Sequence, residues 1–183
     1  RVESMYDPGR DVIGRDRSSD TDLMMFGHYI RNNTGIGFRT FAGGMLVGLG
    51  TIFYLVYNGL FIGAVAGHLT QIGYIDTFYT FVVGHSSFEL TAIVLSGSAG
   101  LKLGLSILLP GRRRRIESLK AAAKESLNMV YGMAAMFFVA AFIEAFWSST
   151  TSLAPEIKYS VGGFLWFIVI FYFVFVGRRR AAG

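Results

Sequence analysis

The stretch FVVGHSSFELTAIVLSGSAG, which runs from Phe81 to Gly100, places a histidine and a glutamate four residues apart inside an apolar run. Residues four apart lie on one face of a helix, so His85 and Glu89 would project together. A charged side chain at the centre of a bilayer costs roughly 3 kcal/mol on insertion scales, and such residues almost always pair, face the protein interior or line a pathway. What this pair does therefore depends on the solvent around the run.

Composition indicates that this solvent is a lipid bilayer. Of the 183 residues, 52% are hydrophobic and only 16% are charged. No Asp, Glu, Lys or Arg occurs between Arg39 and Asp76, and apolar runs of about 20 residues are long enough to cross a bilayer as helices. A soluble bundle of this length would lack the polar surface to cover so many apolar segments. We therefore predict an all-α, polytopic membrane protein with five or six hydrophobic helices.

The distribution of charge argues against nucleic acid as a partner. The net charge is +5, but the basic residues flank apolar segments, as the positive-inside rule predicts. We interpret the run Arg112, Arg113, Arg114 and Arg115 as a cytoplasmic topology marker, with a site for anionic lipid headgroups as the alternative. The sequence contains no cysteine, which excludes disulfides and thiolate metal sites.

The chain divides into three segments by composition. It begins with Arg and has no signal-peptide pattern, so we expect a longer amino-terminal region to precede it. Apolar residues in 19–33 predict a short amphipathic helix at the membrane surface, which Asn32 and Asn33 would end. The segments are 1–35, cytoplasmic or interfacial; 36–177, a transmembrane helical domain; and 178–183, a basic cytoplasmic tail.

Glycines at a spacing of four predict close helix packing. Small residues at this spacing allow helix backbones to approach closely in lipid, which makes a homodimer plausible. Asn58-Gly59 is a strong turn signal near the middle of the uncharged stretch 40–75, so we predict a tight hairpin of two helices there. The glycines assigned to packing are Gly44, Gly48, Gly59, Gly63, Gly67, Gly100 and Gly104.

Topology predicts a second reversal at the segment SGSAG, Ser96 to Gly100. If the amino-terminal segment and the arginine run are both cytoplasmic, an even number of crossings must precede Arg112. We therefore predict a broken, re-entrant helix pair that meets at SGSAG, which would bring Lys102 back to Glu89. A single long tilted helix with the amino terminus outside is the competing topology.

Three segments, NGLFIGAVAGHL, GHSSFELTAIVLSGSAGLKLG and AAFIEAFWS, together resemble the stage II sporulation protein M family. The resemblance extends from about Tyr6 to Gly177, and MYDPG and MMFGHYIRNN are similar to the version found in Gram-negative bacteria. It implies a multi-pass protein of the bacterial inner membrane without established enzymatic activity, a scaffold that recruits cell-envelope partners. In spore formers the namesake anchors peptidoglycan-degrading partners during engulfment. Members often have His-Gly where this chain has His85-Ser86.

Four interpretations of the ionisable residues His85, Glu89, Lys102 and Glu144 remain open. The first, which we favour, is a structural lock. The second is a proton or ion pathway in a permease or channel-like component. The third is a metal site, but a third ligand is not evident and the His-Glu-x-x-His pattern is absent. The fourth is an intramembrane hydrolase. We expect no metal, no cofactor and no enzymatic activity.

Overall fold

The structure, a computed structural model, describes residues 2–9, 19–150 and 152–176. These residues form helices joined by short connections and include no strand, so the predicted all-α class is confirmed. In chain order the elements are α1 (Val2–Tyr6), α2 (Ser19–Ala42), the 3-10 turn η1 (Gly43–Met45), α3 (Leu49–Gln71), α4 (Ile75–Val82), α5 (Ser86–Leu108), α6 (Arg115–Phe142) with its π-helical end η2 (Ile143–Ser148), and α7 (Pro155–Phe171) with its π-helical end η3 (Tyr172–Val176).

Four helices within the described ranges are long and apolar enough to cross a membrane. These are Leu49–Gln71, Ser86–Leu108, Arg115–Ser148 and Pro155–Val176. Two further helices belong to the bundle. Helix α2 is as long as the spanning helices but carries more charge, and α4 has only 8 residues.

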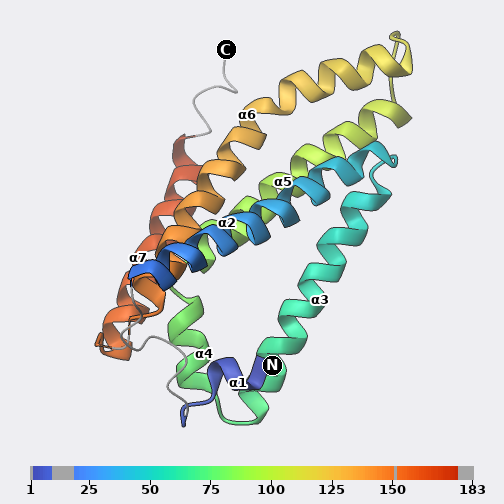
Figure 1. Cartoon of the computed structure of the whole chain (residues 1–183). Helices are drawn as coiled ribbons and strands as arrows, with labels where there is room; N and C mark the ends of the chain where they lie inside the picture. Colours follow the sequence, from blue (N-terminus) through green and yellow to red (C-terminus); the bar gives the residue numbers. More distant parts are fainter. Residues whose placement is uncertain (1, 10–18, 151, 177–183) are drawn as a thin grey trace.

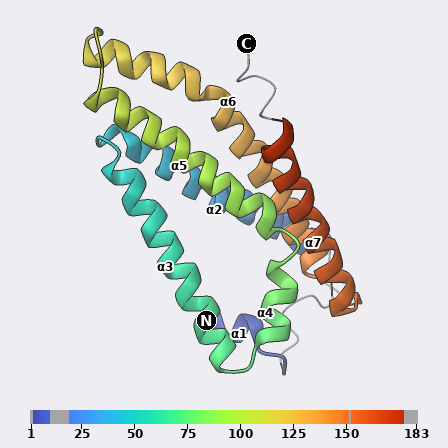
Figure 2. The same ribbon diagram turned by 180° about the vertical axis from the view of Figure 1, so that it is seen from behind.

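The core of the bundle is formed by α2, α5 and α6, which lie side by side in both views (Figures 1 and 2). Helix α2 comes close because Gly37 has no side chain: a Cβ there would lie 3.0 Å from the Ser96 hydroxyl oxygen. Helix α7 packs against α5 and α4. The buried apolar side chains between α5 and α6 are Ala92, Val130, Met133 and Phe137.

Helix α2 is not the short surface helix that we predicted. It continues through Asn32 and Asn33 to Ala42, across the predicted segment boundary at residue 35, and it packs lengthwise against α5 and α6. The physical reason is a continuous buried face whose residues recur every three or four positions, the period of a core-facing helix. The residues of this face are Tyr29, Asn33, Gly37 and Thr40.

The predicted hairpin at Asn58-Gly59 is also wrong, because α3 passes through these residues as one helix. The Asn58 side chain donates to the Tyr54 carbonyl oxygen at 2.7 Å, which satisfies its amide within the helix. In lipid a backbone must satisfy its own hydrogen bonds, so the turn preference of Asn-Gly is overridden. The reversal occurs earlier, at Val47 and Gly48, where φ is positive (58° and 86°).

Helix α5 passes uninterrupted through Ser96–Gly100, so the predicted break at SGSAG is wrong. Figure 2 shows α5 as one continuous helix, and the break between α4 and α5 lies at its amino-terminal end. The hydroxyl groups of Ser96 and Ser98 each donate to the carbonyl oxygen four residues earlier, so these serines fit within a helix. The small residues allow the turn between α2 and α3 to lie close to α5, and they do not reverse the helix.

Close backbone contact at these glycines joins α5 to the turn between α2 and α3. A Cβ on Gly100 would lie 2.8 Å from the Thr40 carbonyl oxygen, and one on Gly104 would lie 2.6 Å from the Gly48 Cα. Gly44 packs directly on the Gly100 backbone. By contrast, in the part of the chain that the structure describes, nothing lies within 4 Å of a Cβ placed on the three α3 glycines, Gly59, Gly63 and Gly67.

The long helices run between two ends of the molecule. One end carries η1 and the α5–α6 connection with Arg112 to Arg115, and the other carries α1, α4 and the α6–α7 connection (Figure 1). His85 follows α4 and Ser148 ends η2, so both lie at the end away from the arginine run.

Candidate functional site

His85 occupies the break between α4 and α5, as the residue that precedes the first turn of α5. It is 4% exposed, and its ring lies edge-on to Phe81 with 5.4 Å between centroids. At the preceding residue, Gly84, a Cβ would overlap the Trp147 ring, so the absence of a side chain there allows η2 to lie close to the α4–α5 break. The imidazole Nδ1 lies 3.1 Å from the Ser148 hydroxyl oxygen, so this contact orients the ring and leaves Nε2 facing α5 and η2.

Two carboxylates lie at the Nε2 side of His85. Glu89 follows one turn later on α5, and its Oε2 is 3.8 Å from Nε2. Glu144 comes from η2, far away in sequence, and one ligand atom from each of the three side chains lies within 4.8 Å of the others. Short π-helical segments inside α-helices frequently occur at functional sites. The structure thus brings together three of the four predicted network residues.

Asn33 on α2 completes the polar lining on the Glu144 side. It is 3% exposed, and its Nδ2 donates to Glu144 Oε2 at 3.4 Å. Asn32 Nδ2 donates to Asn33 Oδ1 at 2.9 Å, which fixes the orientation of the Asn33 amide. From α1, Tyr6 lines the same cavity as the cluster; burial, and secondarily Glu144, raise the pKa of its phenol.

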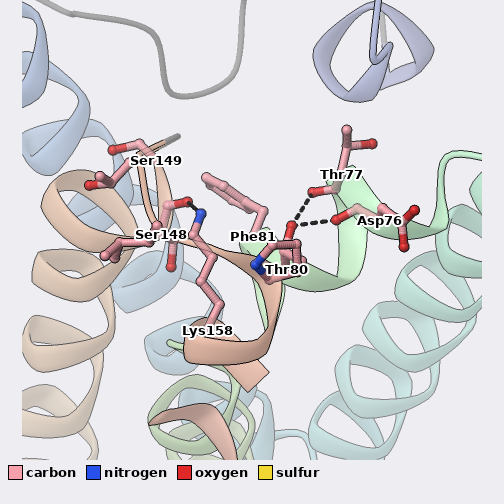
Figure 3. A pocket seen from close by; sticks show the side chains of 10 residues that line it. Asp76, Thr77, Thr80, Phe81, Ser148, Ser149 and Lys158 are labelled. Atoms are coloured by element: carbon pink, nitrogen blue, oxygen red, sulfur yellow. Dashed lines mark hydrogen bonds between the residues drawn. The ribbon is translucent and has the colours of Figure 1, made fainter. Parts of the chain in front are cut away.

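Ser148 connects the cluster to α7. Its hydroxyl contacts His85, and its carbonyl oxygen accepts a hydrogen bond of 2.9 Å from Lys158 Nζ, which is buried. Figure 3 shows Lys158 extending from α7 to Ser148, beside a cavity of about 260 Å³. On the α4 side of that cavity, the Thr80 hydroxyl donates to the carbonyl oxygens of Asp76 and Thr77.

A larger cavity of about 380 Å³ is lined in part by His85, Glu89 and Glu144. Its walls come from α1, α2, α3, α4, α5 and η2. One wall is polar, with His28, Asn32, His85 and the two carboxylates, whereas α3 contributes only apolar side chains. The polar cluster therefore borders a space in which water or a small ligand could be accommodated.

Lys102 does not join this cluster, which corrects the predicted network. Because α5 is continuous, Lys102 lies 13 residues beyond Glu89, or about 20 Å along the helix axis. It pairs instead with Glu125 on α6, with 2.9 Å between Nζ and Oε2. Among the described residues, neither Glu89 nor Glu144 forms an ion pair with a lysine or arginine.

The model of the Stage II sporulation protein M family matches residues 2–149. The chain belongs to the stage II sporulation protein M family. A protein of Methanocaldococcus jannaschii described as the uncharacterized protein MJ0793 is 27% identical over 127 residues, which cover 66% of this chain and 69% of that protein. No solved structure matches the chain. Together with the four long apolar helices among the described residues, family membership makes the chain a membrane protein.

The polar residues that meet at the cluster, His85, Glu89, Glu144, Ser148 and Asn33, lie within the part that matches the stage II sporulation protein M family. Lys158 and α7 lie beyond that part. The cluster is therefore built from the segment that defines the family, and α7 supports it from outside that segment.

Sequence reasoning missed three members of the site. Asn33 was expected only to end a helix, and neither Ser148 nor Lys158 carried an expected role in the site. All three act through contacts between elements far apart in the chain, for example Asn33 with Glu144. The available signal was the helical spacing of Asn33 with Tyr29 and Gly37, which places it on the buried face of α2.

Proposed function

We propose that the chain is a non-catalytic, multi-pass scaffold of the bacterial cytoplasmic membrane, which associates with a second copy through α3 and recruits cell-envelope partners. The observation that carries this proposal is the contrast between two sets of glycines. Gly44, Gly48, Gly100 and Gly104 pack against backbone within the chain, whereas a Cβ built on the glycine stripe of α3, at the same spacing, meets none of the described residues within 4 Å.

Helix α3 is also the least covered of the spanning helices. Only 6% of its apolar window is buried in the chain, compared with 39% for α5 and for α6. Lipid provides no hydrophobic force between helices, so association in a membrane depends on close packing of small residues. A glycine stripe on an uncovered helix is therefore a suitable surface for a second membrane helix.

The orientation that we propose follows from the arginine run. The connection with Arg112 to Arg115 would face the cytoplasm, because cytoplasmic loops carry an excess of Lys and Arg. The polar cluster and α1 lie at the opposite end of the bundle and would then face the cell envelope, so this orientation replaces the cytoplasmic amino-terminal segment that we predicted from the sequence. A scaffold for envelope partners would present its polar end on that side.

Substitution of the α3 stripe tests the assembly. We expect Gly63→Leu to convert a dimer in native membranes into a monomer, measured by crosslinking before extraction. Gly163→Leu on α7 is the matched control, because that glycine also has nothing within 4 Å and should tolerate the change. A wild-type chain that is monomeric in membranes, or a dimer that is unaffected by Gly63→Leu, would refute assembly through α3.

A transport component is the second candidate, and the 380 Å³ cavity beside His85, Glu89 and Glu144 favours it. Polar residues that line a cavity inside a membrane protein commonly mark ion or substrate paths. Solute flux in proteoliposomes that disappears in Glu89→Gln, while the variant stays folded, would replace the scaffold with this function. The scaffold predicts instead that no flux occurs and that Glu89→Gln lowers the amount of assembled protein.

A further inference from the structure

We propose that His85, Glu89 and Glu144 bind a divalent transition-metal ion of the zinc class. Their ligand atoms converge within 4.8 Å at the edge of the 380 Å³ cavity. In a tetrahedral site with bonds near 2.0–2.1 Å, neighbouring ligand atoms lie about 3.4 Å apart. The 3.8 Å between His85 Nε2 and Glu89 Oε2 is close to that spacing and longer than a hydrogen bond.

The imidazole is prepared as a ligand. His85 is almost fully buried, and its Nδ1 is held by Ser148, so Nε2 points at the carboxylates without a hydrogen-bond partner of its own among the described residues. Histidine ligands in metalloproteins use this arrangement, in which the second ring nitrogen contacts an oxygen that fixes the orientation of the ring. Asn33 holds Glu144 in the same supporting way.

Charge balance favours a dication at this position. Two carboxylates face each other in a low-dielectric surrounding, and within the described residues neither has a lysine or arginine partner. Lys158, the buried cation nearby, donates to the Ser148 carbonyl instead. A bound dication would neutralise both carboxylates and so remove the repulsion between them and much of the cost of burying them.

The ligand set selects the class of metal. Mg²⁺ and Ca²⁺ prefer sites built from oxygen atoms alone, whereas an imidazole nitrogen with carboxylates suits Zn²⁺ and its neighbours. Three protein ligands leave a fourth position, which would face the cavity. Bound metal would connect the start of α5 to η2, and this role does not depend on assembly through α3.

Cobalt titration tests the site in the full chain. The protein is purified in detergent with an affinity tag that contains no histidine, stripped with a chelator and titrated with Co²⁺, whose visible absorption reports nitrogen and oxygen ligands in a low-coordinate site. We expect about one equivalent to bind and to be displaced by Zn²⁺ but not by Mg²⁺. Absence of saturable Co²⁺ binding by the wild type, or displacement by Mg²⁺ as effective as by Zn²⁺, would overturn the proposal.

Variants assign the ligands. His85→Gln and Glu144→Gln should each weaken binding by more than about 100-fold, and Ser148→Ala by about 10–100-fold, because loss of a supporting contact is less severe than loss of a ligand. His68→Gln is the matched control, since His68 forms a superficially similar pair with Glu3 (2.7 Å) on the exposed surface. Equal affinity in the wild type and both ligand variants would refute the assignment.

Thermal unfolding keeps the test decisive if a variant is poorly folded. Zn²⁺ should raise the midpoint of the wild type and of His68→Gln, and it should leave folded ligand variants unchanged, because only a ligand that binds the native state stabilises it. If the ligand variants aggregate, the Co²⁺ titration of the wild type alone decides whether the site exists: saturable binding supports it, and no saturable binding refutes it. A wild-type midpoint that Zn²⁺ does not raise would count against the site.

Discussion

Replacement of Gly100 by alanine is the sharpest test of how this bundle is held together. Gly100 lies in the middle of α5, where the turn between α2 and α3 presses on the helix. The Thr51 hydroxyl donates to the Thr40 carbonyl oxygen at 2.7 Å directly above this position. An added Cβ would overlap that hydroxyl and lie 2.8 Å from the carbonyl oxygen, so the methyl group would force the donor and the acceptor of this hydrogen bond apart.

Three contributions set the size of the effect. Overpacking against backbone costs about 1–3 kcal/mol, because the backbone has no alternative rotamer. Loss of the Thr51–Thr40 hydrogen bond costs about 0.6–1.7 kcal/mol in a membrane protein. Alanine in place of a helical glycine stabilises the folded state by about 0.5–1 kcal/mol, which offsets part of this loss. The free energy of unfolding should therefore fall by about 1–4 kcal/mol, although alanine is the better helix former.

Equilibrium unfolding in mixed micelles measures this change. Gly163→Ala is the control, since it gains the same helix propensity and its Cβ meets nothing within 4 Å. We expect Gly163→Ala to be as stable as the wild type or slightly more stable, and Gly100→Ala to be clearly less stable. If the Gly100 variant matches or exceeds the control, the close contact between α5 and the α2–α3 turn is not as we describe it.

Further predictions concern other elements. Gly59→Ala should raise the free energy of unfolding of the detergent-solubilised monomer by about 0.5–1 kcal/mol, because the position is an exposed interior residue of α3; a loss of stability of the monomer would instead indicate a turn. Lys102→Gln should leave the thermal midpoint nearly unchanged, because its pair with Glu125 is exposed; a large drop would contradict this. Gly162→Ala should lower the midpoint, since its Cβ would lie 2.7 Å from the Val83 carbonyl oxygen; unchanged stability would mean that α7 packs differently.

Much of the helical architecture could be predicted because it depends on local properties. Long apolar runs predicted a helical protein with membrane-spanning segments, but the stretches that form α3 and α5 were each predicted as two shorter helices. The two reversals were misplaced for one reason. Asn58-Gly59 and Ser96 to Gly100 are turn signals in water, but α3 and α5 satisfy their own backbone hydrogen bonds and remain helical through both.

The candidate site was predictable only in part. The spacing of His85 and Glu89 follows from one helix, so their shared face could be derived from sequence. The residues that contact this face could not be derived from the sequence, because Glu144, Ser148 and Asn33 reach it from other elements. Lys102 was misassigned as a consequence of the misplaced reversal, since its distance from Glu89 depends on whether α5 is straight.

The sequence alone determined that this is a helical membrane protein and that a histidine and a glutamate share a helix face, because hydropathy and helical periodicity are properties of neighbouring residues. Tertiary structure decided which glycines pack within the chain, where the chain reverses, and that Glu144 rather than Lys102 faces His85 and Glu89. These features depend on how separate helices approach one another, and the close approach of small residues that governs helix packing in lipid is not encoded in any single segment.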